Sequence, residues 1–319
     1  MFWRSDIGPE NQPYKVTIKR DKFIDEARDG REVPFKVYYP TGHHLKYLPV
    51  IVWSHGLGGG RDGAGFLSRY MASNGYIVVN IQHPGTDTSL WQGKPGHPWD
   101  VIRATHISRK ITLARFRDVP FFLDHFPAWV QEQEDIAELA DFDRLGMSGH
   151  SFGAITTQVI AGQKLGRKNR MYQIKDDRIK AAISYSPSHA YNRDEPHEDV
   201  YGSIDKPMLF MTGTEDDSPI SGHDYEYRLP IYQNASEQLP QSVPQYLAVL
   251  DQGDHMVFSG SRGQLGENPK RGLHESIIKV LSYAFWEAYL QEDQDALEWL
   301  NSDSVREWLL DECLFEYKF

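Results

Sequence analysis

The sequence predicts an α/β fold: a mostly parallel, eight-stranded sheet with helices on both faces. Two observations lead to this. Six of the eight strand-like runs are short, apolar and rich in β-branched residues, as in strands buried on both faces. Helical patterns alternate with these runs, which is the order of a parallel sheet. The strand-like runs are residues 15–20, 33–39, 49–54, 76–81, 144–148, 179–185, 207–212 and 245–250.

The remaining segments predict how the chain is organised. No helix separates the first two strand-like runs, so we expect them to form an antiparallel edge. No linker divides the chain, which predicts one domain over residues 1–319, ending in a helical tail at about 274–319. Polar insertions follow strands and should wall the site, because loops at the carboxyl ends of parallel strands form it. The helical patterns are 65–74, 111–126, 151–161 and 274–290, and the insertions are about 83–110, 187–204 and 218–244.

Composition narrows the function class. The formal net charge is -11, which argues against nucleic acid or an anionic membrane as the main partner. The one cysteine, Cys313, cannot form an intramolecular disulfide, which fits a reducing compartment. No signal-peptide pattern and no run long enough to span a membrane is visible. We therefore expect a cytoplasmic protein, with a secreted mature form as the open alternative, and the oligomeric state stays open.

One motif points to nucleophilic catalysis. Gly149-His150-Ser151-Phe152-Gly153 has the form G-x-S-x-G, with a strand-like run before the serine and a helical pattern after it. That context is typical of a nucleophile elbow, in which a sharp turn exposes the serine hydroxyl. The small glycines permit a turn too tight for larger residues. The alternative is an ordinary strand-to-helix turn.

A serine nucleophile needs a base, and the base needs an acid that orients it. In this architecture the chain order is serine, acid, histidine. "MTGTEDDSPI" follows the strand at 207–212 and offers Asp216, with Asp217 as the alternative acid. "GDHMVFSG" follows the strand at 245–250 and places His255 where the base is expected.

The glycine-rich "SHGLGGGRDG" follows the third strand. The loop at this place supplies an oxyanion-hole N–H group, so we assign the two donors to the backbones of Leu57 and Phe152. We expect His55 to hold the loop by hydrogen bonds. Residues 58–63 also match the dinucleotide motif G-x-G-x-x-G. That motif requires an acid at the end of the next strand, where the sequence has Gln82 instead.

Other signals concern the pocket. Trp91 and Trp99, in "LWQGKPGHPWD", and His150 are candidates to line the substrate pocket, although residues 90–100 could also pack only against themselves. No zinc motif is present. We expect no metal, no cofactor and a small-molecule ester as the partner.

With these residues placed, the chain resembles α/β-hydrolases of the group that includes platelet-activating-factor acetylhydrolase-like and bacterial dienelactone-hydrolase-like esterases. The resemblance is carried by "SHGLGGGRDG", "GHSFG", "MTGTEDDSPI" and "GDHMVFSG". It implies Ser151 as nucleophile, His255 as base, and Leu57 and Phe152 as oxyanion donors. Dienelactone hydrolases use a cysteine nucleophile, where this chain has Ser151.

The position of the acid also departs from part of that group. The mammalian platelet-activating-factor enzymes place the acid after the strand that follows the nucleophile, and here "ISYSPSHA" carries no carboxylate. An acid one strand later, at Asp216, is similar to cutinase-like polyester hydrolases.

These observations predict a serine carboxylic-ester hydrolase that acts on short-to-medium acyl esters through an acyl-enzyme. Polyesters or phospholipid acetyl esters are the alternative substrates, and amide cleavage is a second enzymatic reading. A catalytically silent binding protein on the same fold is the alternative from another class.

Overall fold

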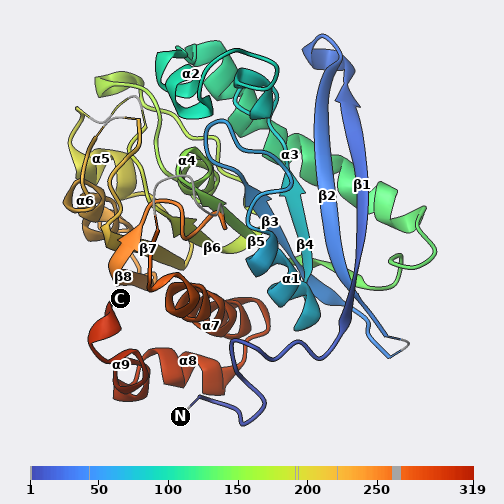
Figure 1. Cartoon of the computed structure of the whole chain (residues 1–319), viewed down its shortest axis with the longest axis vertical. Helices are drawn as coiled ribbons and strands as arrows, with labels where there is room; N and C mark the ends of the chain where they lie inside the picture. Colours follow the sequence, from blue (N-terminus) through green and yellow to red (C-terminus); the bar gives the residue numbers. More distant parts are fainter. Residues whose placement is uncertain (1, 43, 191, 193, 221, 261–266) are drawn as a thin grey trace.

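The computed structural model describes residues 2–42, 44–190, 192, 194–220, 222–260 and 267–319, and in these ranges a nine-stranded sheet runs through the molecule (Figure 1). Along the sheet the strands follow the order β1-β2-β4-β3-β5-β6-β7-β8-β9. The strands are β1 (Lys15–Asp25), β2 (Arg31–Thr41), β3 (Leu48–Ser54), β4 (Ile77–Ile81), β5 (Ala140–His150), β6 (Ile179–Tyr185), β7 (Met208–Glu215), β8 (Gln245–Asp254) and β9 (Cys313–Lys318).

The strand directions confirm a mostly parallel α/β sheet. β4, β3, β5, β6, β7 and β8 run parallel to one another. β1 pairs with β2 antiparallel, as predicted, and β2 joins β4 in the same way. All the parallel strands therefore end at one edge of the sheet, where the loops that follow them can meet.

Helices cover both faces of the sheet (Figure 1). α1 and α7 contact each other on one face, and α3 and α4 contact each other on the other. The helices are α1 (Gly65–Ser73), α2 (Pro98–Ala104), α3 (Arg109–Gln131), α4 (Phe152–Ile160), α5 (His197–Tyr201), α6 (Leu229–Asn234), α7 (Arg271–Leu290), α8 (Gln294–Leu300) and α9 (Asp303–Leu309).

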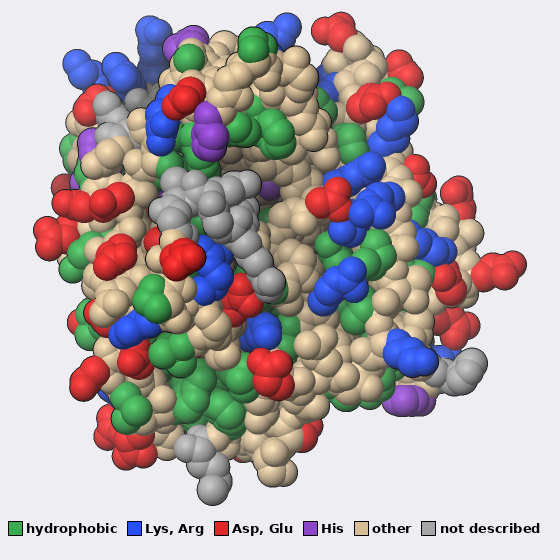
Figure 2. Space-filling model, viewed as in Figure 1, with side chains coloured by type: hydrophobic (Ala, Val, Ile, Leu, Met, Phe, Trp, Pro, Cys, Tyr) green, Lys and Arg blue, Asp and Glu red, His purple; other side chains and the backbone are tan. Residues whose placement is uncertain are grey.

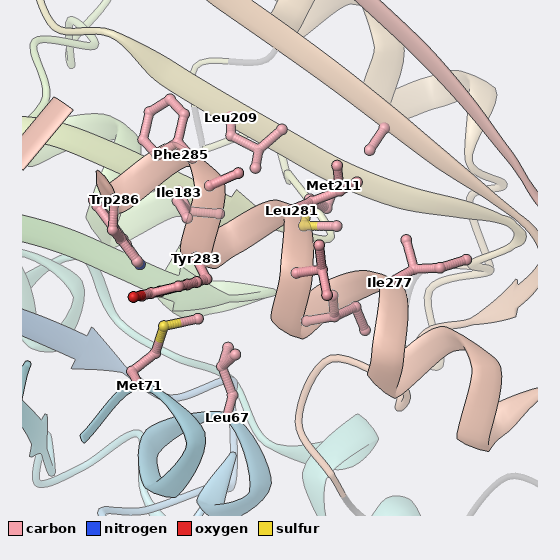
Figure 3. Packing of buried hydrophobic residues seen from close by; sticks show 14 of the residues in the cluster. Leu67, Met71, Ile183, Leu209, Met211, Ile277, Leu281, Tyr283, Phe285 and Trp286 are labelled. Carbon is pink, nitrogen blue, oxygen red and sulfur yellow. The ribbon is translucent and has the colours of Figure 1, made fainter. Parts of the chain in front are cut away.

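Two cores form because successive side chains of a strand point to opposite faces. On β3, Ile51 and Trp53 pack into the core beneath α1 and α7, whereas Val50 and Val52 pack into the core beneath α3. Figure 3 shows the first core, in which side chains of α1, of α7 and of the sheet pack together. The labelled residues are Ile183, Leu209 and Met211 of the sheet, Leu67 and Met71 of α1, and Ile277, Leu281, Tyr283, Phe285 and Trp286 of α7.

The C-terminal segment corrects two predictions. The tail at 274–319 is not helical to its end, and the described sheet has nine strands rather than eight. After α9 the chain forms β9, which pairs antiparallel with β8. The physical reason is a period of two in "CLFEYK": Cys313 and Phe315 are buried, while Leu314 and Glu316 are exposed. That alternation suits a strand with one covered face.

The three insertions carry short helices. α2 lies in the first, α5 in the second and α6 in the third, together with the 3₁₀ helix η4 (Glu226–Arg228).

Figure 2 shows acidic and basic side chains interspersed over one face of the molecule. None of the helices in the described chain is both long and apolar enough to cross a membrane.

Candidate active site

A cavity of about 460 Å³ lies at the carboxyl ends of the parallel strands. The loops that follow β3, β5 and β8 supply Leu57, Ser151 and His255 to its lining. Figure 2 shows a hollow in the upper half of the molecule, bordered by hydrophobic side chains. The structure therefore brings together residues that lie about 100 positions apart in the chain.

Ser151 sits in the turn between β5 and α4 with φ 57° and ψ −112°. This is a strained conformation for a non-glycine residue, and such strain often marks functional sites. The two flanking glycines make the turn possible. A Cβ atom on Gly149 would lie 2.4 Å from the carbonyl oxygen of Gly153, and one on Gly153 would lie 1.9 Å from that of Ser54. The turn is thus as sharp as the G-x-S-x-G spacing predicts.

Asp216 reaches the imidazole of His255. Its Oδ1 lies 2.6 Å from His255 Nδ1, and both side chains are buried. Asp217, the alternative acid, is exposed, and its backbone N–H donates to Glu215. Of the two adjacent carboxylates, the structure therefore brings only Asp216 to the histidine.

The Asp216 carboxylate is held from several sides. Oδ2 accepts hydrogen bonds from Ser186 Oγ at 2.6 Å and from Thr212 Oγ1 at 2.8 Å. Arg228 Nη2 lies 3.0 Å from Oδ1. Burial acts to raise the pKa of Asp216, but the charge of Arg228 and the contact with His255 outweigh burial and lower it below its ordinary value. The carboxylate is thereby kept ionised inside the protein.

His150 lies against His255. Its Nε2 donates to the backbone oxygen of His255 at 2.8 Å, and the two ring centroids are 4.6 Å apart. Burial, followed by the charge of His255, lowers the pKa of His150 to about 3. A neutral His150 in the cavity lining therefore holds the main chain of His255 through this hydrogen bond.

The loop after β3 is tied down around Gly56. The backbone N–H of His83 donates to His55 Nε2 at 3.0 Å, so His55 carries its proton on Nδ1 and donates it to the Gly56 oxygen at 2.7 Å. The same oxygen accepts from the Gly59 N–H. In a trans peptide the following N–H points the opposite way, so the Leu57 N–H points away from the His55 ring. Within the described chain that N–H has no acceptor.

Arg115 of α3 is fully buried and binds this loop through hydrogen bonds. It donates to the backbone oxygen of His55, to Ser54 Oγ at 2.8 Å and to Thr156 Oγ1 of α4 at 2.9 Å. Its guanidinium also lies 4.6 Å from the centroid of the Phe152 ring. The two segments that carry the predicted oxyanion donors, Leu57 and Phe152, are therefore held by one side chain.

A second string of serine, histidine and aspartate lies deeper in the molecule. Ser54 Oγ is 3.0 Å from His83 Nε2, and His83 Nδ1 is 3.0 Å from Asp118 Oδ2. All three residues are fully buried, so no substrate reaches Ser54. Burial, followed by the charge of Arg115, lowers the pKa of His83 to about 4. This hydrogen-bonded series stabilises the loop after β3 and is not exposed at the cavity. Nothing in the sequence singled it out.

Replacing Arg115 by methionine is expected to lower the free energy of unfolding by about 2–4 kcal/mol, because the buried oxygens of His55 and Ser54 lose their donor. Chemical denaturation measures the change. The matched control is Arg117→Met, an exposed arginine on the same helix, for which we expect a change within about 0.5 kcal/mol. Equal stability of the two variants would contradict a bracing role for Arg115.

Apolar side chains form one wall of the cavity. Trp99, Ile102 and Met256 pack together with Leu57 and Trp91, and all five line the cavity. Trp91 Nε1 also donates to the Gly58 oxygen at 2.7 Å. The structure thus places both predicted pocket tryptophans at the cavity, and it places Trp91 against the loop of Leu57 as well.

The insertions contribute unequally to the cavity walls. The first supplies Trp91, Trp99 and Ile102, and the third supplies Pro219 and Ile220. None of the described residues of the second insertion, 187–204, lines the cavity. Residues of that insertion instead contact Arg228, which the sequence did not single out.

One comparison with known families finds a match. The family model of platelet-activating factor acetylhydrolase, isoform II, matches residues 32–91. The match confirms the resemblance to that group and, together with the mostly parallel sheet, the α/β-hydrolase fold. At a coarse level it supports an ester-hydrolysing enzyme. The matched segment contains Leu57 but ends before Ser151, Asp216 and His255. No curated protein matches the chain significantly.

Proposed function

We propose that the chain is a serine carboxylic-ester hydrolase that uses Ser151, His255 and Asp216. One observation carries the proposal: a serine in a strained elbow and a histidine bonded to a buried, ionised aspartate line the same cavity. The chain order of the three residues is the one expected for this fold. The fold itself is compatible with many functions, whereas the residues of the site are specific to this chemistry.

The reaction follows from the roles of these groups. Ser151 Oγ attacks the ester carbonyl carbon while His255 Nε2 takes the hydroxyl proton. Asp216 holds the Nδ1–H and stabilises the charged imidazole. The alkoxide leaves as an alcohol with the proton that His255 carries, and the acyl group stays on Ser151. Water, deprotonated by His255, then cleaves the acyl-enzyme to a carboxylic acid and restores the serine.

The negative charge that develops on the carbonyl oxygen needs preorganised donors. We assign this task to the N–H groups of Leu57 and Phe152. The direction of the Leu57 N–H supports the first assignment, and the start of α4 at Phe152 supports the second. One such donor typically contributes about 3 kcal/mol to transition-state stabilisation.

The cavity favours short-to-medium acyl esters. Its volume of about 460 Å³ is at the small end of ligand sites, and the wall around Trp99 and Ile102 is apolar. The match to the acetylhydrolase family makes a short acyl group such as acetyl the natural first substrate class. A polymer or a lipid would have to present one ester bond inside this cavity.

The test uses p-nitrophenyl esters from acetate to decanoate and a fluorophosphonate probe. We expect hydrolysis with an optimum at a short or medium chain, and stoichiometric labelling of Ser151, because only an activated serine reacts with the probe. An optimum at the longest chain would contradict the assigned substrate size. No hydrolysis and no labelling would overturn the enzymatic proposal in favour of a silent binding protein.

A further inference from the structure

We propose that Arg228 is a positioning residue of the same site: it fixes the Asp216–His255 pair and sets the lowest pH at which the enzyme works. The inference rests on the proposed function. Arg228, a buried arginine of the third insertion, lies against both members of the pair.

Arg228 links two loops that meet behind the site. Its Nε and Nη2 donate to the backbone oxygen of Asp216 at 3.1 and 2.9 Å. Its Nη1 donates to the backbone oxygen of Pro187 and to Ser188 Oγ, both at 3.0 Å. The planar guanidinium thus joins the loop after β7 to the loop after β6. A lysine ammonium has no such fork and cannot span these acceptors together.

The charge of Arg228 acts on the proton balance of the pair. Nη2 lies 3.0 Å from Asp216 Oδ1 and 3.4 Å from His255 Nδ1, and all three side chains are buried. Arginine stays charged throughout the pH range of an enzyme assay. A fixed positive charge this close opposes the binding of an extra proton by the pair. Loss of this charge is therefore expected to move the acidic limit of activity to higher pH.

The surrounding groups do not duplicate this effect. His150 faces His255 across the cavity wall, and His189 lies beside η4 with Nε2 bonded to the Tyr227 oxygen. The pKa values of both are lowered, mainly by burial, to about 3 and about 4. Both therefore stay neutral between about pH 5 and 8. Ser186 and Thr212 contact the Asp216 carboxylate but carry no charge, while Glu215 and Asp217 are exposed.

The experiment separates charge from geometry with two variants. Arg228→Gln keeps an N–H donor but loses the charge, and Arg228→Lys keeps the charge but loses the fork. We measure kcat/KM for p-nitrophenyl acetate as a function of pH. Product is followed by absorbance at the isosbestic wavelength of p-nitrophenol and p-nitrophenolate, where the signal does not depend on pH. For Arg228→Gln we expect the acidic midpoint to move up by about 1–2 pH units. For Arg228→Lys we expect an unmoved midpoint with kcat/KM lowered about 10-fold or more across the profile.

Chemical rescue and a control complete the design. Guanidinium ion at millimolar concentration should restore part of the activity of Arg228→Ala, whereas sodium ion at the same ionic strength should not. Arg144→Gln is the matched control, because Arg144 pairs with Asp141 near the amino end of β5, away from the cavity. This variant should show the wild-type pH profile and no response to guanidinium.

The outcomes are distinct. An active wild type with an unmoved acidic midpoint in Arg228→Gln overturns the inference and leaves the proposed function intact. A wild type that neither hydrolyses esters nor reacts with fluorophosphonate overturns the proposed function instead. If Arg228→Gln does not fold, Arg228→Lys decides, because a shifted midpoint with the charge retained contradicts the assigned role. Circular dichroism reports the fold of each variant.

Discussion

Ser151→Ala is expected to lower kcat/KM for the best p-nitrophenyl ester by about 10⁵-fold. Alanine removes the oxygen that forms the acyl-enzyme and leaves the shape of the turn unchanged. Because Ser151 is only half-buried and its hydroxyl does not cap α4, we expect the free energy of unfolding to change by less than about 0.5 kcal/mol. Steady-state hydrolysis and urea denaturation of the same preparation measure both quantities.

The control for this variant is Ser276→Ala on α7, where the hydroxyl donates to the Gly272 oxygen of the same helix. It should keep the wild-type rate. Peptide mapping after fluorophosphonate treatment adds a direct readout, with the label on Ser151 in the wild type and no label in Ser151→Ala. Hydrolysis retained by Ser151→Ala, or a label on another serine such as Ser54, would refute the assignment of the nucleophile.

The elements that could be predicted are those encoded by local pattern. The elbow is a five-residue motif, and its two glycines are required sterically because neither Gly149 nor Gly153 has room for a side chain. His255 could be placed because only one loop follows the last parallel strand. The sheet followed from runs of apolar residues, which a parallel strand buried on both faces requires.

The choice between Asp216 and Asp217 could not be made from sequence, because adjacent residues share the same position after β7. In the structure, a tight turn in which the Asp216 N–H donates to the Gly213 oxygen brings Asp216 to the His255 ring. That turn buries Asp216 and leaves Asp217 exposed. β9 was missed for a related reason. Its inward-facing residues, Cys313 and Phe315, are buried by core residues that are distant in the sequence and meet them only in the folded chain.

Arg228 and Ser186 have no sequence signature at all. Arg228 lies in a polar insertion with no motif, and its contacts reach residues 12 to 41 positions away. Ser186 directly follows β6, where the mammalian acetylhydrolases in the resemblance carry their acid. Here its hydroxyl donates to Asp216 instead. Ser186 therefore holds a carboxylate that follows the next strand of the sheet, and only the folded contacts reveal this.

Asp216→Asn is expected to lower kcat/KM by about 10⁴-fold, whereas Asp217→Asn should leave it within about twofold. An asparagine amide donates where the carboxylate accepted, so it favours the wrong imidazole tautomer and does not stabilise the positive charge on His255. Asp217 is exposed, and the His255 ring bonds to Asp216 instead. Steady-state kinetics of the two variants at the same pH give the comparison.

The stability of the two variants gives a second, independent comparison. Asp216→Asn leaves the buried guanidinium of Arg228 without its carboxylate partner, which typically costs about 3–5 kcal/mol. Asp217→Asn should cost less than about 0.5 kcal/mol. The double variant Asp216→Asn with Arg228→Gln removes the unpaired charge, so it should regain stability over Asp216→Asn without regaining activity. Equal kinetics for the single variants would refute Asp216 as the acid, and a double variant less stable than Asp216→Asn would refute the buried ion pair.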